Sequence, residues 1–204
     1  MNDLDTRTLA AMYGGAGGPW GPVMVAFTVL GSGWSVLALL PLLRWPRTRT
    51  FAQALAAAIA GQAVFVWAVK AIVGRVRPWI ALHLPAPLPW GAGPHDGSFP
   101  SGHAAGSFCV AVFLAIALPV LWPDAGGRAR GVGAAALASA ALVAASRVYL
   151  GAHFPSDVIA GAAVGSCFGA AGGLWYAKRA APTVTGSLGA GLAGPGLERA
   201  AKRR

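Results

Sequence analysis

Residues 146–157 read SRVYLGAHFPSD and separate two apolar segments of the chain. Residues 131–146 are apolar or small, and residues 158–177 carry no charge. Arg147, His153 and Asp157 are therefore gathered where two hydrophobic stretches meet. Ionisable side chains at membrane depth cost about 2.5–3.5 kcal/mol each on insertion scales, so they seldom occur there without a partner or a task. The stretch indicates two apolar helices that meet at a polar site.

The composition is that of a membrane protein. Of the 204 residues, 56% are hydrophobic and 11% are charged, and the mean hydropathy is +0.60. A soluble domain has about 25% charged residues, and one membrane crossing needs about 20 apolar helical residues. The stretches that meet this length, or nearly so, are 21–43, 51–69, 104–122, 131–146 and 158–177, the fourth running on to residue 150. The sequence predicts an all-α polytopic membrane bundle with about five transmembrane helices and an active site at their outer ends.

Three regions are expected along the chain. Residues 1–20 contain Asp3 and Asp5 and no basic start, so they do not resemble a signal peptide and are interpreted as an interfacial segment. Residues 21–178 form the transmembrane domain, in which Trp34 and Trp67 are interpreted as packing residues. Residues 179–204 are rich in Gly, Ala and Pro with a basic end, which predicts a flexible cytoplasmic tail.

The distribution of positive charge predicts the orientation. With five spans, eleven of the sixteen Lys and Arg residues fall on the face that holds residues 44–50, residues 123–130 and the C-terminus. Positive residues stay cytoplasmic during insertion, so this face is expected inside and the N-terminus and residues 70–103 outside. The net charge of +10 is then explained by topology and contact with membrane lipids, and no nucleic-acid partner is expected. The predicted location is the cell membrane, with a multi-pass chain.

Two further polar clusters belong to the same outer face. In KAIVGRVRP, residues 70–78, Lys70 and Arg77 lie two helical turns apart and point to one side, although side chains that reach toward headgroups are a common alternative. In FPSGHAAGS, residues 99–107, Ser101, Gly102 and His103 begin an apolar helix. A helix start alone would explain these residues, but a hydroxyl, free amides and an imidazole at a positive helix end also suit a phosphate.

Asp157 lies four residues after His153 and can hold its ring in one tautomer, leaving the other nitrogen free to attack. Together the clusters resemble the type 2 phosphatidic acid phosphatase superfamily, whose signature is K-x6-R-P, P-S-G-H and S-R-x5-H-x3-D. The three motifs are complete and in order here, and the resemblance covers about residues 21–178. Many members have six spans, so six is the alternative to five.

The resemblance implies a role for each residue. His153 would be the nucleophile that forms a phosphohistidine, Asp157 would orient it, and His103 would be the general acid. The residues expected to bind the phosphate are Lys70, Arg77, Ser101, Gly102 and Arg147. No metal or other cofactor is expected, because three fixed cations are available and the outer face has few carboxylates: Asp3, Asp5, Asp96 and Asp157.

The expected activity is the metal-independent hydrolysis of a lipid phosphate. An outward site suits polyprenyl diphosphate, the favoured substrate, and also phosphatidate or phosphatidylglycerol phosphate. Two alternatives are a vanadate-dependent haloperoxidase, which shares the phosphate pocket, and a non-catalytic transporter or scaffold that retains it. Lipid substrate and membrane lipids are the expected partners; the sequence predicts no oligomeric state.

Overall fold

The computed structural model describes residues 3–32, 41–87 and 96–180, and every regular element in these ranges is helical. The elements are α1 (Asp3–Met12), α2 (Gly21–Leu30), α3 (Pro46–Val73), α4 (Pro78–Ala81), α5 (Gly102–Leu121), the short 3₁₀ helix η2 (Pro123–Ala125), α6 (Gly126–Tyr149) and α7 (Pro155–Ala180). The predicted all-α membrane bundle is confirmed.

In the described ranges, four helical segments are long and apolar enough to cross a membrane. They contain α3, α5, α6 and α7 and correspond to the second to fifth predicted spans. Of the first predicted span, residues 21–30 form the shorter apolar helix α2, while residues 33–40 lie outside the described part. Residues 181–204, most of the predicted tail, also lie outside it.

Prolines and small residues set where the long helices begin and end. Pro46 and Pro155 occupy first turns, where the missing N–H costs no intrahelical bond. Gly74 ends α3 in the left-handed conformation, with φ 57°, and its amide bonds to the carbonyl of Lys70. Arg75 and Arg77 therefore leave the helix and turn back toward the bundle.

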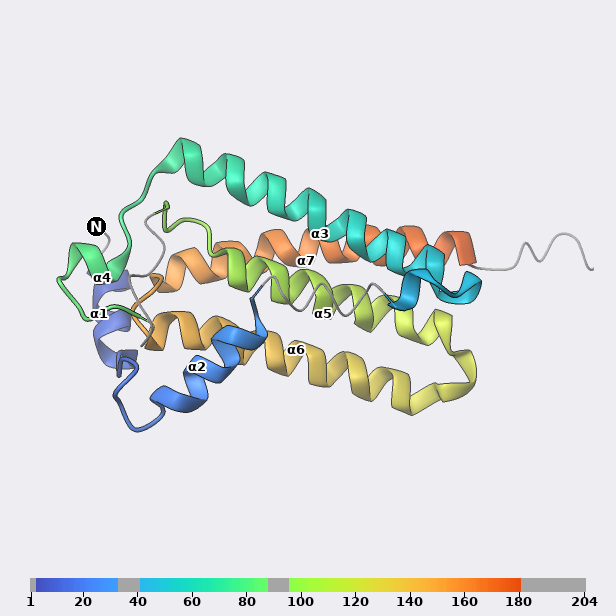
Figure 1. Ribbon diagram of the computed structural model, residues 1–204, viewed down its shortest axis with the longest axis horizontal. Coiled ribbons are helices and arrows are strands. Elements are labelled where there is room, and N and C mark those ends of the chain that lie inside the picture. The colour runs from blue at the N-terminus through green and yellow to red at the C-terminus, as the bar shows by residue number, and fades with distance from the viewer. Residues whose placement is uncertain (1–2, 33–40, 88–95, 181–204) are drawn as a thin grey trace, which may run out of the picture.

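Helix α5 lies at the centre and contacts α7 and α6 most extensively, with α3 packed against α5 and α7 (Figure 1). The glycines of α7 face α5 at four-residue intervals, and a Cβ added at Gly165 would lie 2.0 Å from the Ala105 carbonyl oxygen. Small residues allow this close backbone approach between membrane helices. The approach brings the first residues of α5 and α7 together, and the Ser101 amide donates to the Asp157 carbonyl at 2.9 Å.

The outward face of the bundle is apolar. Ile72, Ile159 and Trp67 are 83%, 70% and 71% exposed, which fits contact with lipid rather than with water. The interpretation of Trp67 as a packing residue is therefore wrong, since the ring points away from the neighbouring helices. Trp34 lies outside the described residues.

The functional residues gather at one end of the bundle. Figure 1 shows α1, α4, the last turn of α3, the end of α6 and the start of α7 together at its left end, opposite to η2 and the end of α7. The turn between α6 and α7 depends on Gly151, whose φ of 71° favours glycine. The Arg147 carbonyl accepts from the amides of Ala152 and His153, which fixes where His153 lies.

Candidate active site

The structure brings the predicted site residues to the ends of four long helices. Lys70 lies in the last turn of α3, Arg77 follows that helix, and Arg147 lies in the last turn of α6. Ser101 caps α5 and precedes Gly102 and His103, while His153 lies just before α7 and Asp157 in its first turn. Sequence segments 87 residues apart, from Lys70 to Asp157, thus contribute to one site.

The hydrogen bonds of His153 define its tautomer. Arg77 Nη1 lies 3.1 Å from Nε2 of the ring, and an arginine can only donate, so Nε2 is the unprotonated nitrogen. The proton of the neutral ring is then on Nδ1, which faces the Ser98 hydroxyl at 3.4 Å and Asp157 Oδ2 at 3.6 Å. The Nε2 lone pair is therefore the one available for chemistry.

His153 is buried, with 1% of its surface exposed. Burial lowers the pKa of the ring from its usual 6.5 to about 3, and although the nearby Asp157 carboxylate opposes this, the charges of Arg147 and Arg77 add to it. The ring is consequently neutral at physiological pH in the unliganded protein. A neutral imidazole with a fixed tautomer can act as a nucleophile or a base.

Both oxygens of the Asp157 carboxylate accept hydrogen bonds. Oδ1 accepts from Arg75 Nη1 at 2.6 Å, and Oδ2 accepts from the Ser98 hydroxyl and from the Phe154 amide at 2.9 Å. Ser98 thus accepts from His153 and donates to Asp157. The sequence predicted that Asp157 orients the ring directly; in the structure the Ser98 hydroxyl lies between the ring and the carboxylate.

A second carboxylate, from α1, extends this network. Asp5 Oδ2 accepts from Arg75 Nη2 at 2.8 Å and from the Ser156 hydroxyl at 2.6 Å, while Oδ1 accepts from the Ser156 amide at 2.9 Å. Burial favours a raised pKa for the Asp5 carboxyl, but the bonds from Ser156 and Arg75 outweigh it and the pKa is lowered. Arg75 therefore lies between two ionised carboxylates, Asp5 and Asp157.

Lys70 and Arg77 share a different partner, Asp96. Its Oδ2 lies 2.9 Å from Lys70 Nζ and its Oδ1 lies 2.7 Å from Arg77 Nη2. Burial favours a raised pKa for the Asp96 carboxyl, but the hydrogen bonds from Lys70 and Arg77 outweigh it and lower the pKa. Two of the three cations predicted to bind phosphate are thus held by one carboxylate in the unliganded protein.

Arg147 and His103 complete the polar surface. Arg147 is 1% exposed and donates to the Thr28 hydroxyl of α2 at 3.1 Å, while its Nε has no partner among the described residues. His103 is partly buried, and the charges of Arg147, Arg77 and Lys70 act on its ring. An arginine with unused donors and an imidazole beside it suit an anion.

Ser101 and Gly102 have the roles expected at a helix start. The Ser101 hydroxyl accepts from the Ala104 amide at 3.4 Å and is completely buried, so it caps α5. Gly102 lines a cavity of about 350 Å³ between α3, α5, α6 and the end of α2. Contact of either residue with a phosphate stays a prediction.

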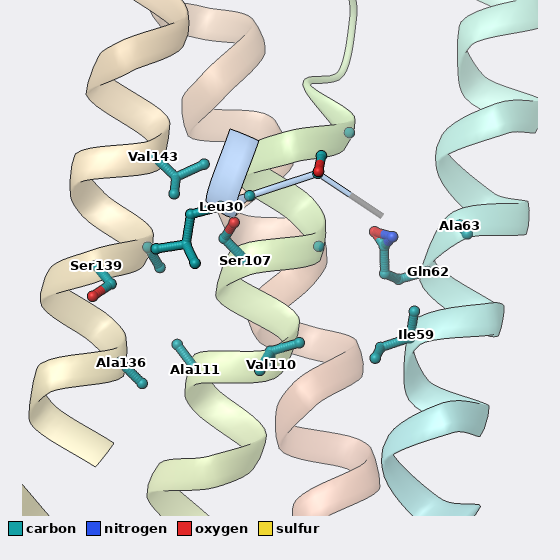
Figure 2. A pocket seen from close by; sticks show the side chains of 15 residues that line it. Leu30, Ile59, Gln62, Ala63, Ser107, Val110, Ala111, Ala136, Ser139 and Val143 are labelled. Atoms are coloured by element: carbon teal, nitrogen blue, oxygen red, sulfur yellow. The ribbon is translucent and has the colours of Figure 1, made fainter. Parts of the chain in front are cut away.

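The cavity is mostly apolar. Figure 2 shows α3 and α6 on its two sides with α5 between them, and Gln62 and Ser107 among its few polar side chains. Most of the remaining lining is aliphatic, including Leu30, Ile59, Val110 and Val143. Such a space beside a cationic cluster suits a ligand with an apolar chain and an anionic head.

Five polar residues of the site were assigned no role from the sequence: Thr28, Arg75, Asp5, Asp96 and Ser98. A signal existed for the acids, because the chain has only six Asp and Glu residues and four of these, Asp5 and Asp96 among them, lie on the predicted outer face. Arg75 stands inside the KAIVGRVRP motif, so it was close to the predicted pair. Ser98 and Thr28 have no feature that distinguishes them from other small polar residues.

Comparison with known proteins identifies the arrangement. The model of the PAP2 superfamily matches residues 51–181. Over 142 residues the chain is 34% identical to decaprenylphosphoryl-5-phosphoribose phosphatase of Mycobacterium tuberculosis. The aligned region covers 68% of each protein.

Two solved structures have a similar fold. A PAP2-type phosphatidylglycerolphosphate phosphatase from Bacillus subtilis is 25% identical, with a TM-score of 0.71 over 87% of this chain and 88% of that one. LpxE from Aquifex aeolicus is 28% identical, with a TM-score of 0.64 over 84% of this chain and 95% of that one.

Proposed function

The chain belongs to the PAP2 superfamily and is a membrane lipid phosphatase, and we propose that it removes a phosphate from a polyprenyl-linked lipid through a phosphohistidine at His153. The observation that carries the mechanism is the His153 ring, which is neutral, has Nε2 unprotonated, and lies near the charges of Arg77 and Arg147. The polyprenyl preference rests on the relative named for decaprenylphosphoryl-5-phosphoribose and on the outward site expected from charge.

The first chemical step would transfer the phosphoryl group. Nε2 of His153 attacks phosphorus, the N–P bond forms, and the P–O bond to the lipid breaks as the leaving oxygen takes a proton from His103. The positive charge that grows on the His153 ring is balanced by Asp157 through Ser98. Lys70, Arg77 and Arg147 stabilise the charge on the phosphoryl oxygens.

The second step would release phosphate. His103, now neutral, accepts a proton from water as the water oxygen attacks phosphorus, and the N–P bond breaks. His153 returns to its neutral state with the proton still on Nδ1. The Arg77 guanidinium, which bonds to Nε2 in the unliganded protein, shifts to the phosphoryl oxygens whenever substrate binds.

Metal independence follows from the donor set in this proposal. Among the described residues, no group of three or more His, Cys, Asp or Glu side chains could hold a metal ion. The positive charge that a metal ion would provide is supplied instead by three cations, Lys70, Arg77 and Arg147. This supports a reaction that proceeds in the presence of a chelator.

The lipid chain is proposed to occupy the cavity that Gly102 lines (Figure 2). Gly102 lies next to His103, so the head of a lipid in this space would reach the general acid. We place this end of the bundle on the outer face, since the opposite end holds exposed basic residues that favour the cytoplasm, Arg128, Arg130 and Arg179 among them.

A substrate panel tests the proposal. Purified protein in detergent with a chelator is offered polyprenyl diphosphate, decaprenylphosphoryl-5-phosphoribose, phosphatidate and phosphatidylglycerol phosphate, and released phosphate is measured. Turnover is expected with at least one polyprenyl substrate, and the rate is expected to be higher with it than with the two phospholipids. No release from any lipid by protein that elutes as a folded species would defeat the proposal.

Two further measurements address the intermediate and the orientation. Rapid quenching with ³²P-labelled substrate is expected to give protein-bound label that is stable in base and labile in acid, as for a phosphohistidine, and none in His153→Ala. A C-terminal reporter fusion is expected to be active in the cytoplasm. A reporter active only outside would place the site on the inner face.

A further inference from the structure

The Asp96 carboxylate forms ion pairs with two of the three cations that the proposed function assigns to phosphate, Lys70 and Arg77. It lies 2.9 Å from Lys70 Nζ and 2.7 Å from Arg77 Nη2. Backbone carbonyls next to this carboxylate accept further hydrogen bonds from the same two cations. Arg77 Nε donates to the Asp96 carbonyl at 3.0 Å, and Lys70 donates to the Gly97 carbonyl. An anion that binds between Lys70 and Arg77 must therefore compete with Asp96.

The carboxylate is placed where it can give way. The Asp96 side chain is 51% exposed, whereas the side chains of Lys70 and Arg77 are 12% and 3% exposed. The cations are thus held by the bundle, while the acid reaches them from its edge. The Ser98 amide donates to the Arg75 carbonyl at 2.7 Å, which anchors the backbone two residues further on.

The charge balance of the site sets what can replace Asp96. Asp157 is paired with Arg75, Lys70 and Arg77 share the single negative charge of Asp96, and no described carboxylate pairs with Arg147. A phosphodiester headgroup carries one negative charge, so its binding in place of Asp96 would only exchange one monoanion for another. A phosphate monoester carries nearly two at neutral pH and gains attraction from all three cations.

We propose that Asp96 is a specificity-determining residue that keeps monoanionic phosphodiester lipids off Lys70 and Arg77 and yields to dianionic phosphate monoesters. The inference rests on the proposed function and deepens it. An enzyme whose cavity opens within a bilayer meets far more phosphodiester headgroups than substrate, so a resident carboxylate reduces occupation of the site by the lipids around it.

The first test measures inhibition. Wild type and Asp96→Asn hydrolyse a monoester lipid in neutral-detergent micelles at about pH 8, above the second phosphate pKa of about 6, with increasing phosphatidylglycerol as the phosphodiester competitor. The inhibition constant for phosphatidylglycerol is expected to fall about five- to tenfold in Asp96→Asn, relative to any change in KM for the monoester. Asp96→Glu keeps the charge and is expected to retain most of the discrimination.

The controls separate specificity from stability. Asp124→Asn changes an exposed acid at the opposite end of the bundle and should leave the inhibition constant at the wild-type value. Asp96→Ser is a second neutral variant in case Asp96→Asn elutes as an aggregate. An unchanged inhibition constant in a folded neutral variant would overturn the inference, even with normal turnover.

The second test does not need turnover. Calorimetry measures the binding of glycerol 3-phosphate, a soluble monoester, and of diethyl phosphate, a soluble diester, to each purified variant. Wild type is expected to bind only the monoester with measurable heat, and Asp96→Asn to bind both. If turnover is absent but this binding pattern appears, only the proposed function fails; if wild type and Asp96→Asn bind the two ligands with equal selectivity, or bind neither, the Asp96 inference fails.

Discussion

The two ring nitrogens of His153 face two differently built surroundings. The Nδ1 side, formed by Ser98, Asp157, Arg75 and Asp5, is a chain of hydrogen bonds in which each carboxylate oxygen has at least one donor. On the Nε2 side, Arg147 Nε lacks a partner among the described residues, and Lys70 and Arg77 are held by a half-exposed acid, Asp96. We infer that the Nδ1 side is already organised in the unliganded protein, whereas the Nε2 side has hydrogen-bond donors that a bound substrate would use.

This contrast predicts how variants divide. Changes on the Nδ1 side alter how well the proposed nucleophile, His153, is oriented, so they should lower kcat with little effect on KM. Changes on the Nε2 side remove proposed contacts to the phosphate itself, so they should raise KM and lower kcat/KM by more than kcat. The nucleophile belongs to both sides.

Removal of that nucleophile is expected to have the largest effect. His153→Ala should lower phosphate release on the order of 10⁴-fold or more, because it removes the Nε2 lone pair that attacks phosphorus in the proposed mechanism. The measurement is phosphate release by protein that elutes as wild type does. His83→Asn, a change at an exposed histidine with φ 54°, is the matched control and should keep full activity. Normal turnover by His153→Ala would show that the nucleophile is assigned wrongly.

Arg147→Lys tests the Nε2 side. Lysine keeps the charge but replaces the planar guanidinium with one ammonium nitrogen, which cannot occupy both the Nη1 position that bonds to Thr28 and the position of the Nε that has no partner among the described residues. We expect kcat/KM to fall about 10- to 100-fold, measured by steady-state kinetics on a monoester lipid. Arg128→Lys, at an exposed position near η2, should be neutral. A fall in kcat alone, with KM unchanged, would indicate that Arg147 orients His153 rather than binding the phosphate.

Ser98→Ala tests the Nδ1 side. The change removes the hydroxyl between His153 and Asp157 and leaves the ring facing Oδ2 at 3.6 Å, beyond hydrogen-bond range. The expected result is a fall in kcat of about tenfold with KM within a factor of about two. Ser98→Thr retains the hydroxyl and should recover part of the rate. If both variants lose the same activity, packing rather than the hydroxyl explains the loss.

Much of the fold was readable from the sequence because a bilayer restricts the choices. Long uncharged segments such as 158–177 must be helices, and residues such as Gly151 and Pro155 mark where one ends and the next begins. The direction in which Trp67 points was not readable. A helix that is apolar all round gives no periodicity to distinguish the lipid-facing side from the packed side.

The site was readable to the extent that its chemistry is local in sequence. Lys70, Arg77, His103, Arg147, His153 and Asp157 were predicted from motifs, and the structure brings them to one end of the bundle. Asp5 and Asp96 were recognised only as acids on the predicted outer face. Asp5 lies 70 residues from its partner Arg75, and Asp96 lies 19 residues from its partner Arg77, so the pairing depends on tertiary structure that no spacing encodes.

Asp5→Asn is expected to have the smallest effect, because Asp5 acts on the nucleophile only through Arg75 and Asp157. The amide keeps an acceptor for Ser156 but loses the charge that Arg75 binds, so kcat should fall about threefold with KM unchanged. The thermal midpoint should fall by roughly 3 °C, for a loss of about 1 kcal/mol. Asp3→Asn is the matched control on α1, since Asp3 is 75% exposed and its ion pair with Arg7 lies on the surface.

The pH dependence of this stability difference gives Asp5→Asn a sharper reading. Burial alone would raise the pKa of the Asp5 carboxyl, but the bonds from Ser156 and Arg75 hold it below the ordinary 3.8. A carboxyl whose folded pKa is lowered stabilises the protein above its unfolded pKa and loses that contribution as the pH falls through the folded value. The gap in thermal midpoint between wild type and Asp5→Asn should therefore be constant near neutrality and close as the pH falls below about 4. A gap that stays open in acid would mean that α1 is held by contacts other than the Asp5 charge, and that the bonded side of His153 ends at Arg75.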